Sequence, residues 1–222
     1  MVVRVVTWNL FHGRAVPPCD HELLDAFAAQ LAAWRWDVAL LQEVPPWWPP
    51  ALAAAAGAAE RTALTSRNQL APLRRALARR APELMKSGGG GANAILVRGA
   101  ITAHARRRLT LRPERRVVHA VRDGRGRWFA NLHATVHDAP QARREIALAA
   151  ATARRWAAGA PLALGGDLNV RDPRPPGFAH AGGHGVDHVF VAGGLAPAGA
   201  VERLDRGTLS DHAPVRVTLR AP

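Results

Sequence analysis

Polar side chains that can bind a metal ion or move a proton occur repeatedly where short apolar runs begin or end. Asn9 follows VRVVTW, Gln42 and Glu43 follow DVALL, and His133 follows WFANL. The same kind of position is taken by Asn93, Asp167, Asn169, Asp187, Asp211 and His212. Because strand ends in α/β proteins present their side chains to a common rim, we expect several of these groups to converge although they are far apart in the sequence.

The residue types indicate hydrolysis of a phosphate ester with the help of a metal ion. Asn9 and Glu43 offer hard oxygen ligands, which suit Mg²⁺ or Mn²⁺. His212 can act as a general base if a carboxylate fixes its tautomer. Asp167 and Asn169 can hold a water molecule and a developing oxyanion.

Each residue also has a structural interpretation when it is taken singly. Asn9 could be a turn residue after a strand, and Glu43 a solvated loop carboxylate. Asp167 and Asn169 could form an Asx-turn, and Asp211 could cap a turn. The repetition of the pattern along the whole chain favours a functional site over these separate interpretations.

Apolar and β-branched runs predict the strands that would carry these groups. The expected strands are residues 2–8, 37–42, 94–97, 101–111, 116–121, 127–133, 161–164, 186–191 and 214–219. The spacing of apolar residues predicts one helix that is capped by Asp20 and runs to Trp34, and a second over 68–80 with a basic face. A third helix is expected to open at Asp138 and to end near Gly159.

Prolines and glycines predict the connections between these elements. Prolines at 45–50 predict a loop followed by a short helix, residues 87–91 a glycine-rich turn, and residues 171–185 a loop. Interleaved helices and strands are typical of a mixed α/β protein with helices outside packed sheets. No linker is evident, so we expect a single domain over residues 1–222.

Composition narrows the class of protein and of partner. The single cysteine, Cys19, excludes an internal disulfide and a CxxC zinc site. The net charge of +13 favours polyanions, namely nucleic acid, acidic lipid headgroups or phosphorylated substrates. The sequence has no apolar run long enough to span a membrane, and its start, MVVRVVTWNL, is unlike a secretory leader. We therefore expect a cytoplasmic protein without membrane insertion.

Seven motifs together resemble the endonuclease/exonuclease/phosphatase superfamily, the DNase I-like group. They are TWNL at 7–10, LLQEV at 40–44, GANAILV at 91–97, NLHAT at 131–135, GGDLN at 165–169, VDHVFV at 186–191 and SDHAPV at 210–215. They follow the family's order over nearly the whole chain. The resemblance implies a four-layered α/β sandwich, in which two packed mixed sheets are flanked by helices.

The resemblance also implies roles for the candidate residues. Mg²⁺, or Mn²⁺, is expected at Glu43 and Asn9, with Asp211 near the metal. His212 matches the catalytic histidine, and we assign Asp187 as its partner. The remaining matches are residues around the nucleophile and the phosphate: Asp167 orients the nucleophile, and Asn169, His133 and Asn93 contact the phosphate or substrate.

Two departures from the family pattern concern the substrate. The chain has no tyrosine, which many relatives place against the phosphate, so Arg112, Arg115 or Arg116 could take that place. The connection between GDLN and VDHVFV is also short, which predicts an open cleft.

The leading functional hypothesis is a phosphodiesterase that acts on nucleic acid, because phosphate contacts by basic groups supply most non-specific affinity. The alternatives are a phosphodiesterase or phosphatase for a small-molecule or lipid phosphate, and a non-catalytic phosphate-binding module. The sequence leaves the oligomeric state open.

Three further features have two interpretations each. Trp47 and Trp48 could stack on bases or, as we favour, anchor a proline-rich loop. The arginines of the helix at 68–80 could contact nucleic acid or simply be solvated. His180, His184 and His188 could bind a second metal, but an incidental polar loop is favoured, with His188 expected nearest the site.

Overall fold

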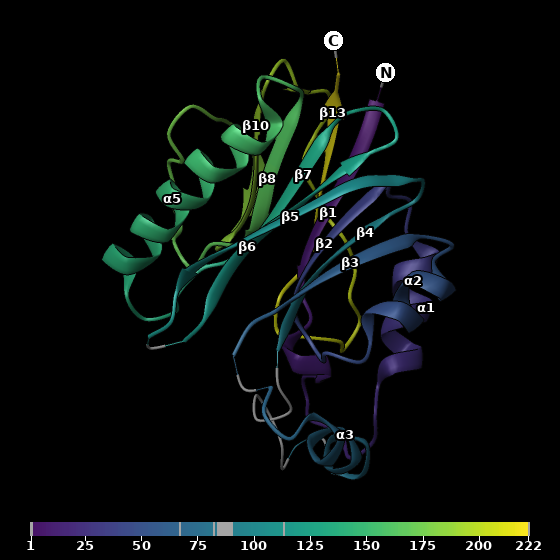
Figure 1. Ribbon diagram of the computed structural model, residues 1–222. Coiled ribbons are helices and arrows are strands. Elements are labelled where there is room, and N and C mark those ends of the chain that lie inside the picture. The colour runs from purple at the N-terminus through teal and green to yellow at the C-terminus, as the bar shows by residue number, and fades with distance from the viewer. Residues whose placement is uncertain (1, 67, 82, 84–90, 113, 222) are drawn as a thin grey trace.

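Two β-sheets lie face to face in the computed structural model, with helices on their outer faces (Figure 1). The structure describes residues 2–66, 68–81, 83, 91–112 and 114–221. One sheet has the strand order β11-β13-β1-β2-β4-β3, with β12 also paired to β13, and the other has the order β5-β6-β7-β8-β10-β9. This arrangement confirms the expected four-layered α/β sandwich.

The elements have the following bounds. The first sheet contains β1 (Val2–Asn9), β2 (Val38–Val44), β3 (Ala59–Leu64), β4 (Ala92–Val97), β11 (Ala196–Pro197), β12 (Glu202–Arg203) and β13 (Val215–Arg220). The second contains β5 (Ile101–Thr110), β6 (Arg116–Asp123), β7 (Trp128–His133), β8 (Leu162–Asp167), β9 (Ala179–His184) and β10 (Asp187–Ala192). The helices are η1 (Phe11–Gly13), α1 (Leu24–Ala33), α2 (Pro49–Ala55), α3 (Ala71–Arg80) and α5 (Ala139–Ala157).

Each sheet has one pair of parallel strands at its centre. β1 and β2 are parallel and are connected through α1, and β7 and β8 are parallel and are connected through α5. Parallel neighbours need such a crossover connection, and both strands of a pair then end at the same edge of the sheet. The two pairs face one another across the sandwich, since β1 contacts β8 and β2 contacts β7. Four strand ends therefore meet at one rim.

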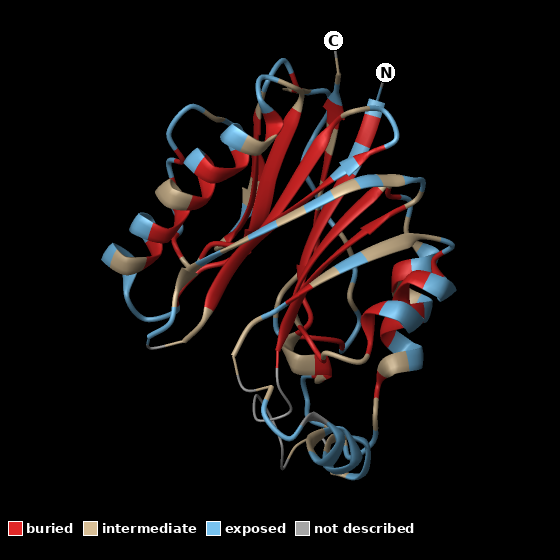
Figure 2. Cartoon of the chain, viewed as in Figure 1, coloured by how far each residue is buried: buried red, intermediate tan, exposed pale blue. Residues whose placement is uncertain are grey.

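Successive side chains of a strand point alternately towards the opposite sheet and towards the helices. In β1, Val3 and Val5 face the opposite sheet, whereas Val6 and Trp8 pack against α1 and α2. Figure 2 shows that the central strands are buried along most of their length and that α1, α2 and α5 are buried on their inner faces, whereas α3 is largely exposed. Strands covered on both faces have continuous apolar runs, which is why the sequence predicted most of them.

Two glycines just before Asp167 occupy positions where a side chain would not fit. A Cβ atom at Gly166, where φ is +141°, would lie 1.8 Å from the carbonyl oxygen of Leu132. A Cβ atom at Gly165 would lie 2.9 Å from Cδ1 of Leu40 in the opposite sheet. The GG of the GGDLN motif is therefore required by packing.

Two of the predicted helices begin later than expected. α1 begins at Leu24 and has no side-chain cap, so the predicted cap at Asp20 is wrong. The intervening Glu22 instead accepts hydrogen bonds from the indoles of Trp47 and Trp48. α3 begins at Ala71, because the side chain of Asn68 donates to the carbonyls of Thr65 and Gly91.

The third helix and the tryptophan loop behave as predicted. Asp138 caps α5 by accepting a hydrogen bond from the Gln141 N–H, and α5 ends at Ala157, just before Gly159. Trp48 is only 2% exposed and packs in the core with α1, which favours anchoring over base stacking.

The predicted loop at 171–185 is wrong in part, because it contains strand β9. Residues Ala179–His184 form β9, which pairs with β10 through main-chain hydrogen bonds although it contains few β-favouring residues. β3 was not predicted either. The predicted glycine-rich turn at 87–91 lies outside the described residues except for Gly91. None of the described helices is long and apolar enough to cross a membrane.

His119 is a titratable side chain in the core between the two sheets. It is fully buried on β6, and its Nδ1 atom lies 3.4 Å from Nε2 of His104. Burial, with a smaller contribution from the charge of His104, lowers the pKa of His119 to about 3 from 6.5. Between pH values of about 3 and 6.5, His119 therefore carries a proton in the unfolded chain but not in the folded chain.

We expect the His119→Gln substitution to flatten the pH dependence of stability. In the wild type, His119 should lower the free energy of unfolding as pH falls from 6.5 towards 3, by at most about 1.4 kcal/mol per pH unit. Urea unfolding at pH 4, 5, 6 and 7 measures this slope, with the exposed His21→Gln as the control for replacing an imidazole. A wild-type slope in the His119 variant would contradict the prediction.

Candidate active site

Asn9, at the end of β1, connects the two sheets at the rim. Its Nδ2 donates to Oδ2 of Asp167, at the end of β8, over 2.9 Å. Its Oδ1 accepts a hydrogen bond of 2.8 Å from the N–H of Phe11. Both residues are buried, so the amide orients the Asp167 carboxylate from within the protein.

Glu43 reaches the same rim because β2 has a bulge. The register with β4 shifts between Leu41 and Val44, and Glu43 has a φ of +50°. A bulge re-aims a side chain at the cost of local strain. The carboxylate of Glu43 lies 3.2 Å from Nε2 of His12 and 3.8 Å from Nε2 of His133.

The environment of Glu43 fits a cation. Burial raises the pKa of Glu43 to about 7, and the charge of Asp211 also raises it, whereas His212, Arg116 and Asn9 oppose the shift. A bound cation would offset this unfavourable burial, because an opposite charge nearby stabilises the carboxylate form. The residue set thus fits a divalent metal of the kind that prefers oxygen ligands.

His212 and Asp187 form a hydrogen-bonded pair. The Nδ1 atom of His212 donates to Oδ2 of Asp187 over 2.8 Å. The other ring nitrogen, Nε2, lies 3.8 Å from Oδ2 of Asp167 and 3.9 Å from Oδ1 of Asp211. One edge of the imidazole is thus held by a carboxylate, while the other faces the rim.

Hydrogen bonds between side chains and the main chain hold the loop that carries His212. The Oγ of Ser210 donates to the carbonyl of Asn9 over 2.7 Å and accepts from the N–H of His212. The indole of Trp8 donates to the carbonyl of His212 over 3.1 Å. The SDH segment is therefore attached to β1, the strand that carries Asn9.

The carboxylates around His212 favour its protonated form. Burial alone would lower the pKa of His212, but the hydrogen bond and charge of Asp187, followed by the charges of Asp167 and Asp211, raise it to about 9. Asp187 is therefore the main group that sets the proton affinity of this imidazole.

Asp167 and Asn169 form the turn that follows β8. Oδ1 of Asp167 accepts from the N–H of Asn169, which is the Asx-turn considered from the sequence. Asn169 has a φ of +51°, and its amide donates to the carbonyl of Ala134. The turn therefore does not exclude a functional site, because Oδ2 of Asp167 still lies 3.5 Å from Nε2 of His133.

His133 is held in its neutral form. Its pKa lies well below 6.5 because the side chain is buried, and the charges of Arg116, His12 and His212 lower it further. A neutral imidazole at this position can still donate or accept one hydrogen bond at the rim.

Of the three candidate arginines, Arg116 is the one directed into the site. It is 4% exposed, and its charge acts on both Glu43 and His133. Its Nε atom has no hydrogen-bond partner in the described part of the chain, while Nη2 lies 3.0 Å from Glu114. Arg115 instead donates to the carbonyl of Thr65, and Arg112 is exposed.

Two further predicted residues lie near the same rim. Asn93 is buried on β4 opposite the β2 bulge, and its Nδ2 donates to the carbonyl of Val117 over 3.4 Å. Its Oδ1 has no partner within the described ranges. Asp211 is 45% exposed and lies beside His212, on the solvent side of the site.

His188 lies beside Asp187 on β10, but its side chain does not point into the site. Alternation along β10 directs Asp187 towards the opposite sheet and His188 away from it. His188 packs with Phe190 and bonds to the carbonyl of Gly185 and the ring of His180. His184 lies apart from this pair and contacts Arg203.

The sequence analysis missed His12, which lies 3.2 Å from Glu43. Its ring reaches Glu43 because η1 turns sharply, with φ values of +51° at Phe11 and +56° at His12. The only signal in the sequence is a histidine three positions after Asn9, which did not distinguish it from the other histidines of the chain.

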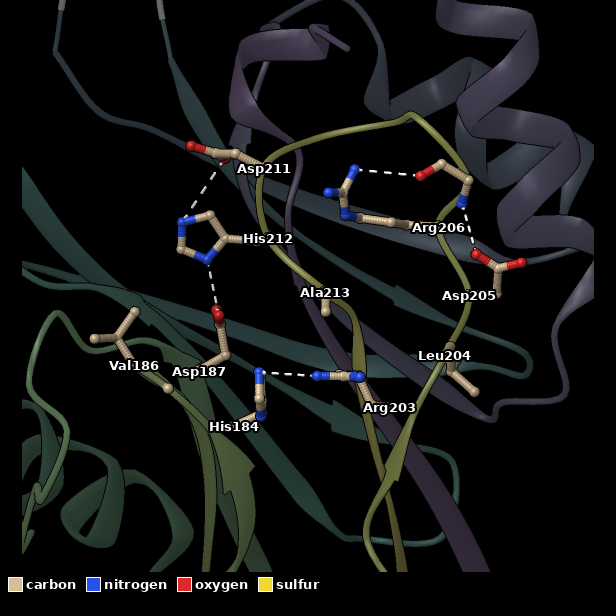
Figure 3. Close-up of a pocket in the computed structure, with 12 residues that line it drawn as sticks. His184, Val186, Asp187, Arg203, Leu204, Asp205, Arg206, Asp211, His212 and Ala213 are labelled. Carbon is tan, nitrogen blue, oxygen red and sulfur yellow. Dashed lines mark hydrogen bonds and ion pairs between the residues drawn. The ribbon is translucent and has the colours of Figure 1, made fainter. Parts of the chain in front are cut away.

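Two carboxylates and an imidazole are clustered beside an open cavity. Ligand atoms of Asp167, Asp187 and His212 lie within 4.8 Å of one another, in a cluster found among the described residues. A cavity of about 640 Å³ begins at His212 and Asp187 and extends towards residues 203–207 (Figure 3). A substrate can therefore reach the cluster from solvent.

Replacing Asp187 tests the assignment of the His212 partner. We expect Asp187→Asn to lower the pKa of His212 from about 9 by at least about one unit, because the charged acceptor is lost while burial persists. NMR titration of the imidazole without added metal measures the shift. Asp211→Asn is the control, and a larger shift in the control than in Asp187→Asn would contradict the assignment.

Comparisons with known proteins identify the family and the fold. Residues 6–212 match the model of the Endonuclease/Exonuclease/phosphatase family. An endonuclease/exonuclease/phosphatase from Beutenbergia cavernae DSM 12333 has 20% identity and a TM-score of 0.76, over 99% of this chain and 72% of that chain. No curated protein matches the sequence at a significant level.

Two TDP2 structures also share the fold. Truncated TDP2 from Caenorhabditis elegans has 18% identity and a TM-score of 0.70, over 100% of this chain and 98% of that chain. TDP2 from D. rerio, complexed with single strand DNA product, has 14% identity and a TM-score of 0.68, over 99% of both chains. These TM-scores show a common fold, and the family match spans most of the sequence. The chain therefore belongs to the endonuclease/exonuclease/phosphatase family, whose hydrolases act on phosphate esters.

Proposed function

We propose that this protein is a Mg²⁺-dependent phosphodiesterase that cleaves nucleic acid by general-base activation of water. The observation that carries the proposal is the 2.8 Å hydrogen bond between His212 and Asp187, with the other edge of the imidazole facing Asp167. A base held by a buried carboxylate has a clear use in proton transfer. A module that only binds phosphate has no need of such a pair.

The proton moves from water to His212. Nε2 of His212, in its neutral form, takes the proton while the water oxygen attacks the phosphorus atom. The ester P–O bond then breaks, and the leaving oxygen takes a proton from solvent. Asp187 fixes the ring and stabilises the imidazolium ion that forms. Asp167, which is oriented by Asn9, accepts a hydrogen bond from the attacking water.

The phosphate oxygens are bound by groups on the opposite side of the rim. His133, which is neutral, and the amides of Asn169 and Asn93 provide hydrogen-bond donors. The guanidinium of Arg116 takes the place of the absent tyrosine and balances the charge of the phosphate. Preorganised donors of this kind stabilise the charge that develops during attack.

Glu43 would hold the metal, with Asn9 and Asp211 beside it. The second lone pair of Asn9 Oδ1 remains available after the bond to Phe11. Mg²⁺, or Mn²⁺ as a substitute, supplies positive charge for the phosphate when it is bound. The raised pKa of Glu43 supports this position.

Charge and the structural neighbours support nucleic acid as the substrate class. The net charge of +13 favours a polyanion, which offers many phosphates, over a substrate with a single phosphate. The D. rerio TDP2 structure holds a single strand DNA product on the same fold. A small-molecule or lipid phosphate is the competing substrate class, which the following assay separates.

Hydrolysis of a substrate panel tests the proposed reaction. We expect Mg²⁺-dependent cleavage of plasmid DNA or RNA that exceeds cleavage of a lipid phosphodiester or an inositol phosphate. His212→Ala should lower kcat by about 10²–10⁴-fold, since general acid–base groups contribute that much. The Tm of the variant is measured on the same preparation, and near-normal kcat in a folded variant would exclude His212 as the base.

Metal binding by Glu43 is tested without substrate. We expect Glu43→Gln to weaken Mg²⁺ binding by at least about tenfold in calorimetry, because a charged oxygen ligand is lost. In the wild type, binding should weaken as pH falls below about 7, because the carboxyl group must lose its proton first. The exposed Glu202→Gln is the control, and equal Mg²⁺ affinity in the two variants would contradict the assignment.

A further inference from the structure

The cavity beside His212 has two chemically different ends. Asp187, Asp211 and His212 lie at one end, and His184 and Arg203 lie at the other (Figure 3). Its volume of about 640 Å³ falls within the range of roughly 300–1,000 Å³ that is usual for ligand sites. The cavity therefore has room for a group of substrate beyond the phosphate that reacts.

Arg203 and His184 provide an anion-binding pair at the second end. Nη1 of Arg203 lies 3.4 Å from Nε2 of His184, and Figure 3 shows the two side chains pointing towards one another. Within the described ranges, no carboxylate lies at ion-pair distance from Arg203. Arg216 on the neighbouring β13, by contrast, pairs with Glu202 at 2.6 Å. Arg203 thus has an unmatched positive charge on the cavity wall.

The other charged residues of this wall have structural contacts. Nη1 of Arg206 donates to the carbonyls of Gly207 and Leu209 and so supports the segment before Ser210. Asp205 accepts a hydrogen bond from the N–H of Gly207 and points away from Arg203 in Figure 3. The wall is therefore preformed, and Arg203 is the cation left to bind a ligand.

We propose that Arg203 and His184 bind a second backbone phosphate of a polynucleotide, next to the phosphate that is cleaved at His212. The proposal rests on the proposed function and deepens it, because it selects a polynucleotide over a small phosphate ester. A guanidinium suits this task, since its planar fork binds two phosphate oxygens at once. A small diester fills only the catalytic end of the cavity and gains nothing from Arg203.

Binding of an oligonucleotide tests the subsite apart from catalysis. The inactive His212→Ala protein is titrated with fluorescein-labelled single-stranded DNA and RNA oligonucleotides, with and without Arg203→Gln. We expect Arg203→Gln to weaken binding about tenfold and to reduce the slope of log Kd against log salt by about 0.7, the value for one phosphate contact on a single strand. Arg203→Lys should restore part of the affinity and part of the salt slope.

The control removes the same charge at a distant position. Arg35 is exposed and precedes β2, at the opposite end of that strand from Glu43. Arg35→Gln should change oligonucleotide affinity less than twofold. Equal effects of Arg35→Gln and Arg203→Gln would show a general charge effect and would overturn the subsite, as would an absence of oligonucleotide binding by the His212→Ala protein.

Kinetics separate failure of the subsite from failure of the proposed function. In the active protein, Arg203→Gln should lower the ratio of kcat/KM for the oligonucleotide to kcat/KM for bis(p-nitrophenyl) phosphate about tenfold. An unchanged ratio overturns the subsite while leaving phosphodiesterase activity established. Arg203-dependent binding without cleavage of either substrate supports the subsite and refutes the proposed reaction.

Discussion

The site depends on hydrogen bonds that join the two sheets at the ends of their parallel strands. Asn9 of β1 donates to Asp167 of β8, and one layer deeper Gln42 of β2 donates to Asn131 of β7 over 2.8 Å. Asn131 in turn donates to the carbonyl of Leu41. Such buried polar contacts are stable only in one register, because a shift would leave donors without acceptors. They therefore fix the relative position of both halves of the site.

Because the site is buried, the protonation states of its groups depend on one another. Burial raises the pKa values of Glu43 and Asp167 and lowers that of His133, so each of these groups favours its neutral form. The Asp187–His212 pair responds differently, because a short hydrogen bond joins opposite charges and outweighs burial at His212. A cation near Glu43 would favour its carboxylate form and would lower the proton affinity of the nearby imidazole. Metal binding and the proton affinity of His212 are thus coupled through charge.

The sequence predicted most of the strands and most of the residues that meet at the candidate site, because both follow simple rules. Strands buried on both faces have apolar runs, and their ends carry the polar residues of the motifs. The sequence could not choose Arg116 among three arginines, since the choice depends on which one is buried beside Glu43. It also missed His12, whose position depends on the left-handed turn of η1 and on the bulge in β2. Strand β9 escaped prediction because main-chain pairing with β10 holds it in place despite its small residues.

The same contrast separates the proposed catalytic residues from the residues proposed to select the substrate. Asn9, Asp167 and His133 lie at the ends of central strands, where packing between the sheets limits which residues can be accommodated. Arg203 lies on β12, a two-residue strand at the edge of its sheet, where substitution disturbs little of the core. Peripheral elements of this kind tolerate change, and binding residues are often found on them. A site at the ends of central strands can therefore stay in place while the residues at the edges of the sheets change.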